Sequence, residues 1–220
     1  MTERNPMIAT AFDFDGTLID SMGMWRNLGR NFVESKGKEY TDAIHDQITT
    51  MSLKQSSAFF KRELELEESP EEIFNEMGAI LLDGYSNNLP LKEGAMEAVE
   101  KARRLGPVVL ATATNQELLM PALHRFQLDD AFDFIQTCDG VGIEKSDAAF
   151  YYTLAERLNA SPDEIILVDD AHYALAAAKE AGLYVVAVKD TYNLPYREAI
   201  VKESDVLLDS LWDFDPERYF

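Results

Sequence analysis

Two acidic side chains, Asp13 and Asp15, stand one residue apart directly after an apolar run at residues 8–12. The run favours a buried strand, and in an extended chain residues i and i+2 point to the same side. We therefore expect both carboxylates to enter one space. Two carboxylates that close repel each other unless one is protonated or a cation lies between them. A strand followed by an acidic turn is the simpler interpretation of the same residues, and further polar residues decide between the two.

These further residues share one position, at or just after the ends of other apolar, strand-like runs. They are Thr112 and Thr114 with residues 108–112, Lys145 after residues 132–137, and Asp169 and Asp170 with residues 165–169. The carboxyl ends of parallel strands meet at one edge of a sheet, and ligands bind outside that edge. The sequence therefore predicts that these side chains gather with the first acidic pair.

Carboxylates, hydroxyls and one lysine at a single edge suit phosphoryl transfer. Carboxylate oxygens bind Mg²⁺, a hard cation, which offsets their mutual repulsion and the charge of a phosphate group. One carboxylate can attack phosphorus, and a second can protonate the leaving alcohol and later activate water. Thr112 and backbone amides can bind phosphate oxygens, while Lys145 supplies a fixed positive charge.

The elements that must position these residues alternate between strand and helix from about residue 91 onward. Continuous apolar strands separated by helices predict an α/β fold, a parallel sheet covered by helices on both faces. Residues 18–85 instead show helical spacing throughout, and the Ser69–Glu72 stretch has the pattern of a capped helix start. We expect this stretch to form a small helical domain over the polar edge of the sheet, ending in a linker at residues 87–90.

Composition limits the choice of partners and compartment. The 220 residues carry a formal net charge of −20, which argues against nucleic acid and anionic membranes because both require basic surfaces. A single cysteine, Cys138, excludes an internal disulfide and favours a reducing compartment. No signal-like apolar segment and no run of about 18 apolar residues is present. We expect a soluble, cytoplasmic protein; nothing in the sequence sets its oligomeric state.

At this point the chain resembles the haloacid dehalogenase superfamily, in its phosphatase and phosphomutase branch with a helical cap. Asp13-Phe-Asp15-Gly-Thr17 is similar to the first motif of that family, Thr112 to the second, Lys145 to the third and Asp169-Asp170 to the fourth. The resemblance covers essentially the whole chain. It implies a Rossmann-like core at residues 1–19 and 87–220 and a mobile cap at residues 20–86.

The resemblance also implies roles for individual residues. Asp13 is the expected nucleophile and Asp15 the general acid and base, with Thr112 and Lys145 as further catalytic residues. Mg²⁺ is expected on Asp13, on the backbone carbonyl of Asp15 and on an acid of the fourth motif, Asp170 being favoured over its neighbour Asp169. The expected phosphate-binding residues are Gly16, Thr17, Thr112, Ala113, Thr114 and Lys145.

Two stretches depart from the family pattern. Relatives commonly have Lys-Pro-x-Pro-Asp around the third motif, whereas this chain has Glu144-Lys-Ser-Asp147. After the fourth motif, where Ser and Gly are common, Ala171, His172 and Tyr173 follow. The lysine charge is kept, and the tyrosine is expected to narrow or reshape the site.

The favoured function is a Mg²⁺-dependent phosphatase that hydrolyses a small phosphorylated metabolite through an aspartyl phosphate. A sugar-phosphate phosphomutase is the alternative, although residues 49–54 lack the arginine that mutase relatives carry there. A dehalogenase is disfavoured because Asp15 supplies a second acid that a departing halide does not need. A non-catalytic, receiver-like phosphate-binding module is the remaining alternative, but such modules are about half this length and lack an inserted helical domain, which suits an enzyme that excludes water.

Overall fold

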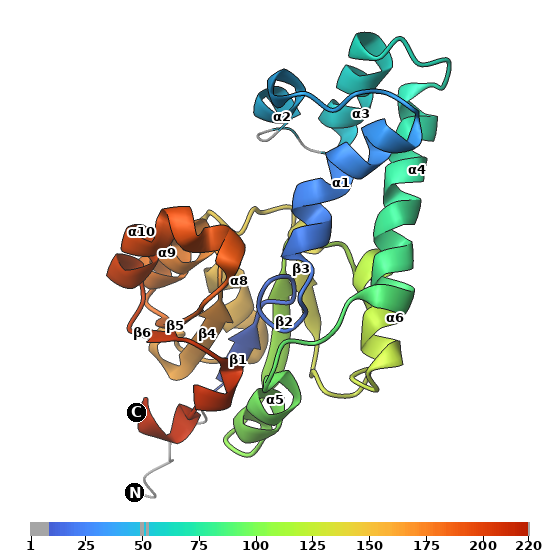
Figure 1. The fold of residues 1–220 in the computed structure, drawn as a ribbon. Helices are drawn as coiled ribbons and strands as arrows, with labels where there is room; N and C mark the ends of the chain where they lie inside the picture. Colours follow the sequence, from blue (N-terminus) through green and yellow to red (C-terminus); the bar gives the residue numbers. More distant parts are fainter. Residues whose placement is uncertain (1–8, 49–50, 52, 220) are drawn as a thin grey trace, which may run out of the picture. The chain divides into compact units, whose positions relative to one another are not determined.

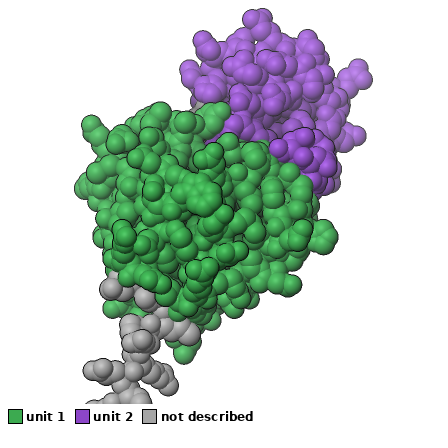
Figure 2. Space-filling model, turned by 60° about the horizontal axis from the view of Figure 1, so that its bottom comes forward, with its two compact units in different colours: residues 1–21, 89–220 green, residues 22–88 purple. Residues whose placement is uncertain are grey.

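The computed structural model describes residues 9–48, 51 and 53–219 of the chain (Figure 1). The chain divides into two compact units, residues 1–21 with 89–220, and residues 22–88 (Figure 2). The first residue of the predicted opening strand, Ile8, lies outside the described residues. The predicted boundaries at residues 19/20 and 86/87 fall two residues before those of the units.

The larger unit is built on one six-stranded sheet in which every neighbouring pair is parallel, in the order β3-β2-β1-β4-β5-β6. The strands are β1 (Ala9–Phe12), β2 (Val108–Thr112), β3 (Ile135–Thr137), β4 (Ile165–Asp169), β5 (Tyr184–Val188) and β6 (Val206–Leu208). The chain builds outward from β1 on one side and then on the other. The strand order therefore reverses at β1, the position where ligands bind in such sheets.

Helices cover the sheet on both faces (Figure 1), which confirms the predicted α/β class. They are α5 (Ala95–Arg103), α6 (Gln116–Arg125), α7 (Cys138–Val141), α8 (Ala148–Leu158), α9 (His172–Ala181) and α10 (Arg197–Glu203), with short turns η2 (Pro162–Glu164), η3 (Thr191–Tyr196), η4 (Leu211–Asp213) and η5 (Pro216–Arg218). Alternate strand residues such as Ala11 and Leu167 pack with Phe150 and Leu175 of α8 and α9. On the other face Phe12 packs edge-on against Phe214, their ring centroids 5.6 Å apart.

The smaller unit is entirely helical within the residues that the structure describes. It contains α1 (Met22–Ser35), α2 (Asp42–Ile48), α3 (Leu53–Glu63), α4 (Pro70–Asp83) and a wider final turn, η1 (Gly84–Asn88). Its own core includes Phe32 and Phe60, with ring centroids 5.4 Å apart. Ser69 and Glu72 form the capping box predicted from the sequence.

Local boundaries differ from the sequence-based expectation in two places. The expected linker at 87–90 begins later, because Asn87 and Asn88 donate to the Asp83 carboxylate at 2.8 and 3.0 Å and extend the last turn. The strand expected at 132–137 begins only at residue 135, and a short helix follows it at once. No described helix has the length and apolar character needed to cross a membrane.

The two chain segments that connect the units are hydrogen-bonded to each other within the larger unit. Asp20 N donates to Pro90 O and Lys92 N donates to Leu18 O, both at 2.9 Å. The segment that leaves the sheet and the segment that returns to it are thus held side by side.

Candidate active site

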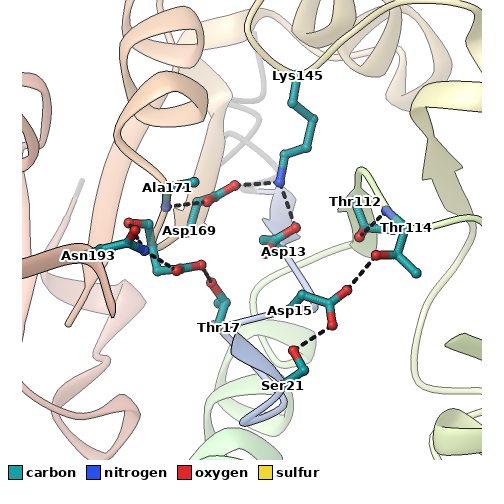
Figure 3. A network of polar contacts seen from close by, with 11 residues as sticks. Asp13, Asp15, Thr17, Ser21, Thr112, Thr114, Lys145, Asp169, Ala171 and Asn193 are labelled. Carbon is teal, nitrogen blue, oxygen red and sulfur yellow. Dashed lines mark hydrogen bonds and ion pairs between the residues drawn. The ribbon is translucent and has the colours of Figure 1, made fainter. Parts of the chain in front are cut away.

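Three carboxylates gather where the two central strands end. Asp13 follows β1, and Asp169 is the last residue of the neighbouring β4 (Figure 3). Asp170 comes directly after Asp169. One oxygen from each lies within 4.8 Å of the other two, and all three residues are buried. The pairing of β1 with β4 continues through Asp13 N, which donates to Val168 O at 2.9 Å. The sheet register therefore brings together acids that are 156 residues apart in sequence.

Lys145 lies between two of these acids. Its ammonium nitrogen is 2.6 Å from Asp13 Oδ1 and 2.6 Å from Asp169 Oδ2 (Figure 3), and its side chain is 3% exposed. Burial alone would lower the pKa of Lys145, but the two carboxylates outweigh that effect and raise its pKa well above the ordinary value. The lysine is therefore a fixed positive charge.

Asp15 faces a different set of partners. Its carboxylate accepts hydrogen bonds from Ser21 Oγ at 2.6 Å and from Thr114 Oγ1 at 2.7 Å. Thr112, at the end of β2, accepts from Thr114 N at 3.1 Å and so holds this loop. The side chain of Asp15 does not belong to the three-carboxylate group (Figure 3). The group of Asp15 that is expected to bind a metal ion is its backbone carbonyl.

Gly16 permits the close approach of Asp170. Its φ is +81°, a conformation that glycine adopts without steric cost. A Cβ atom at this position would lie 2.5 Å from Asp170 Oδ2, which no real contact tolerates. The next residue, Thr17, donates from its hydroxyl to Asp170 Oδ1 at 3.1 Å. A side chain at residue 16 would therefore displace one of the three acids.

The charges of the group are unbalanced without a cation. Three carboxylates and one ammonium leave two negative charges in a buried space. Burial raises the pKa of Asp13 well above its ordinary value, against the lowering by Lys145. Burial, and then the charge of Asp169, raises the pKa of Asp170 to about 7. A doubly charged ion with a preference for oxygen ligands fits this donor set.

Most of the residues selected from the sequence meet at this edge of the sheet. They are Asp13, Asp15, Thr17, Thr112, Thr114, Lys145 and Asp169 (Figure 3), together with Asp170, with Gly16 and Ala113 between them in the chain. Within residues 49–54, the stretch compared with the mutase relatives, residues 49, 50 and 52 lie outside the described part of the chain. His172, which follows the fourth motif, stacks on Tyr196 with ring centroids 4.1 Å apart.

Sequence reasoning missed two residues that bind these acids. Ser21 holds Asp15, and the side-chain amide of Asn193 donates to both the carboxylate and the backbone carbonyl of Asp170. Asn193 lies five residues past the end of β5. The rule that selects loops after strand ends applies to it, but asparagine is a common turn residue and did not stand out.

Comparison with known proteins finds similar sequences and a similar solved structure. Residues 9–182 match the family described as haloacid dehalogenase-like hydrolase. A phosphorylated carbohydrates phosphatase from Thermotoga maritima is 31% identical over 179 residues, 80% of this chain and 82% of that protein. A validoxylamine A 7'-phosphate phosphatase from Streptomyces hygroscopicus subsp. limoneus is 28% identical and covers 91% of this chain and 92% of its own length. A solved structure from Thermotoga maritima, assigned as a β-phosphoglucomutase, superposes with a TM-score of 0.78 at 28% identity, covering 96% of this chain and 98% of that one.

Proposed function

Because the chain belongs to the haloacid dehalogenase-like hydrolase family, as a phosphoric monoester hydrolase, we propose that it cleaves a small phosphorylated metabolite through an aspartyl phosphate. The observation that carries the proposal is the separation of two acids of one motif into different environments. Asp13 lies with the lysine and the other acids, whereas Asp15 is held by two hydroxyls. Two acids in different environments can take different roles in one reaction.

Asp13 is the proposed nucleophile. Its Oδ1 is bound by Lys145, and no hydrogen bond to Oδ2 is found within the described residues. An oxygen of Asp13 attacks phosphorus, the bond from phosphorus to the substrate oxygen breaks, and the phosphoryl group becomes an acyl phosphate on Asp13. Lys145 stabilises the negative charge that spreads over the transferring group.

Asp15 is the proposed general acid and base. In the first step it gives a proton to the departing alkoxide, so that the product leaves as a neutral alcohol. In the second step it takes a proton from water, which attacks the acyl phosphate and releases inorganic phosphate. Ser21 and Thr114 keep the Asp15 carboxyl pointed at this task by their hydrogen bonds. Thr112 supports Thr114 by accepting from its backbone amide, and we propose that Thr112 and the loop amides bind phosphate oxygens.

Mg²⁺ is the proposed cofactor, with Asp13, Asp170 and the backbone carbonyl of Asp15 as its ligands and Asp169 beside them. When bound, the ion offsets the charge of the acids and of the phosphate group. Asp170 is favoured over Asp169 because Lys145 already binds Asp169, while the partners of the Asp170 carboxylate are uncharged. The helical unit at residues 22–88 is proposed to act as the cap that selects the substrate.

Phosphorylated carbohydrates are the proposed substrate class, because a relative that matches four fifths of the chain is named for them. The structural likeness to a protein assigned as a β-phosphoglucomutase keeps phosphomutase as a second candidate. The two reactions differ in their products. A phosphatase releases inorganic phosphate, whereas a mutase moves the phosphoryl group to another hydroxyl of the sugar and releases none.

The test is a panel of sugar phosphates and one aryl phosphate, assayed for inorganic phosphate with Mg²⁺ and with chelator. We expect turnover with Mg²⁺, loss of turnover in Asp13→Asn, and unchanged turnover in the matched control Asp209→Asn, whose carboxylate is 82% exposed. Acid quenching during turnover should trap the phosphoryl group on wild-type protein. Full activity in Asp13→Asn would refute the assignment of the nucleophile, and isomerised sugar phosphate without phosphate release would favour the mutase.

A further inference from the structure

The Asp170 carboxylate is held from two sides by uncharged groups. Thr17 Oγ1 donates to Asp170 Oδ1 at 3.1 Å, and the side-chain amide of Asn193 donates to Oδ2. The same Asn193 amide donates to the backbone carbonyl of Asp170 at 3.1 Å. Asn193 is itself only 7% exposed. One side chain thus fixes both the main chain and the carboxylate of this acid.

Both groups that donate to the Asp170 carboxylate are uncharged, a hydroxyl and an amide. A carboxylate has about four lone-pair sites, so two hydrogen bonds leave roughly one site free on each oxygen. An ammonium group in the place of Asn193 would compete with a cation for the charge of Asp170. A neutral amide fixes the orientation of the carboxylate and leaves its charge for another partner. Asp169 shows the contrast, because an ammonium does bind it.

Asn193 is anchored through Asp190, which forms a partly buried ion pair with Lys92. The turn η3 that carries it is capped by Asp190, whose Oδ1 accepts from Tyr192 N at 2.8 Å. Asn193 N donates to the Asp190 carbonyl at 3.2 Å. The other carboxylate oxygen of Asp190 lies 2.7 Å from Lys92 Nζ, with side-chain exposures of 4% and 16%.

These contacts close a ring around Asp170. Lys92 N donates to Leu18 O at 2.9 Å, and Leu18 follows Thr17, the residue that binds Asp170 from the opposite side. The two groups that hold the carboxylate are therefore tied to each other through Lys92 and Asp190. Movement of Asn193 away from Asp170 would require the turn, the ion pair or the loop after β1 to give way.

We propose that Asn193 is a positioning residue that orients the Asp170 carboxylate toward the divalent cation, with the Lys92–Asp190 pair fixing Asn193. The inference rests on the proposed metal-dependent function and adds a residue to it. Groups that orient metal ligands without touching the metal typically change metal affinity or activity by about 10- to 100-fold when they are replaced.

The experiment compares the thermal stability of Asn193→Leu, Asn193→Ala and wild type over a Mg²⁺ titration, with activity measured in parallel. Leucine keeps nearly the shape of asparagine and removes its hydrogen-bond donors. The leucine variant therefore still provides a folded protein if alanine leaves a cavity that is too large. The matched control is Asn87→Leu, since the Asn87 amide also donates to a carboxylate, that of Asp83, at 2.8 Å in the helical unit.

We expect the apparent Kd for Mg²⁺ to rise about 10- to 100-fold in both Asn193 variants and to stay unchanged in the control. Turnover should recover at saturating Mg²⁺, because the ligand itself is still present. An unchanged Kd, with melting temperature lowered equally at every Mg²⁺ concentration, would show a purely structural role and overturn the inference. Absence of any Mg²⁺ effect on wild type would instead overturn the proposed metal site.

Discussion

Replacing Lys145 by methionine should destabilise the metal-free protein strongly. The ammonium lies 2.6 Å from both Asp13 Oδ1 and Asp169 Oδ2, and the three side chains are 3%, 8% and 0% exposed. Removal of one partner from a buried ion pair costs about 3–5 kcal/mol, because a charge is left buried without compensation. At these exposures solvent screens the interaction between the charges only weakly. We expect the free energy of unfolding to fall by that amount.

The assay is urea unfolding in the presence of chelator. Lys189→Met is the matched control, because Lys189 pairs with Asp209 at 3.1 Å while their side chains are 44% and 82% exposed. An exposed pair contributes about 0–1 kcal/mol. Both variants should unfold with the slope of wild type, so that midpoints compare stabilities directly. Added Mg²⁺ should recover part of the loss in Lys145→Met by supplying positive charge to the same acids.

The loss should also depend on pH with a defined sign. The pKa of Asp13 is raised in the folded protein by burial even with the lysine present, and removal of the lysine raises it further. A raised pKa in the folded state means that the stability is present at low pH and is lost as pH rises through that pKa. The stability deficit of Lys145→Met should therefore shrink as the pH is lowered through the raised pKa of Asp13. A deficit below about 1 kcal/mol, or one that is independent of pH, would refute the reasoning.

Three further predictions concern single positions. Gly16→Ala should cost more stability than Gly37→Ala. Both glycines have a positive φ, at which an alanine is strained by about 1–3 kcal/mol, but only at Gly16 would the new Cβ lie 2.5 Å from Asp170. Equal melting temperatures of the two variants would contradict this. Asp170→Asn should abolish the Mg²⁺-dependent rise in melting temperature, whereas Asp169→Asn should weaken it and also lower stability through the lost Lys145 ion pair; the reverse order would assign the metal to Asp169. Tyr151→Phe should leave the free energy of unfolding unchanged or raise it by up to about 1 kcal/mol, because the buried Tyr151 hydroxyl has no hydrogen-bond partner among the described residues; a clear loss in urea unfolding would show that the hydroxyl is bound.

The parts of the fold that could be predicted are those with a strong local cause. Parallel strands buried on both faces are continuous apolar runs, so β1, β2, β4 and β5 were visible as such, and the capping box at Ser69 is a short-range pattern. The last turn at Asn87 and Asn88 was not visible, since it depends on amide contacts to Asp83. The order of the strands was not predicted either, because it depends on pairing between distant segments.

The candidate site divides in the same way. Asp13, Lys145 and Asp170 have residue types that suggest chemistry at strand ends, so composition and position together selected them. Asn193 has the same position, after β5, but a residue type that turns use for local reasons. Its importance depends on where its amide points, toward Asp170, and that direction is set by the Asp190 turn and Lys92. A rule based on position alone would have selected Asn193, but it would also have selected many ordinary turn residues.

Positively charged side chains are distributed unevenly around the three acids. Lys145 binds Asp13 and Asp169 and so keeps a positive charge at the proposed nucleophile. A second ammonium on Asp170 would leave only one negative charge in the group and weaken its attraction for a divalent cation. The ammonium of Lys92 is instead bound to Asp190, one step away, and only the neutral amide of Asn193 reaches Asp170. The fold therefore fixes the position of Asp170 rigidly and leaves its charge available, which is the combination that a metal ligand requires.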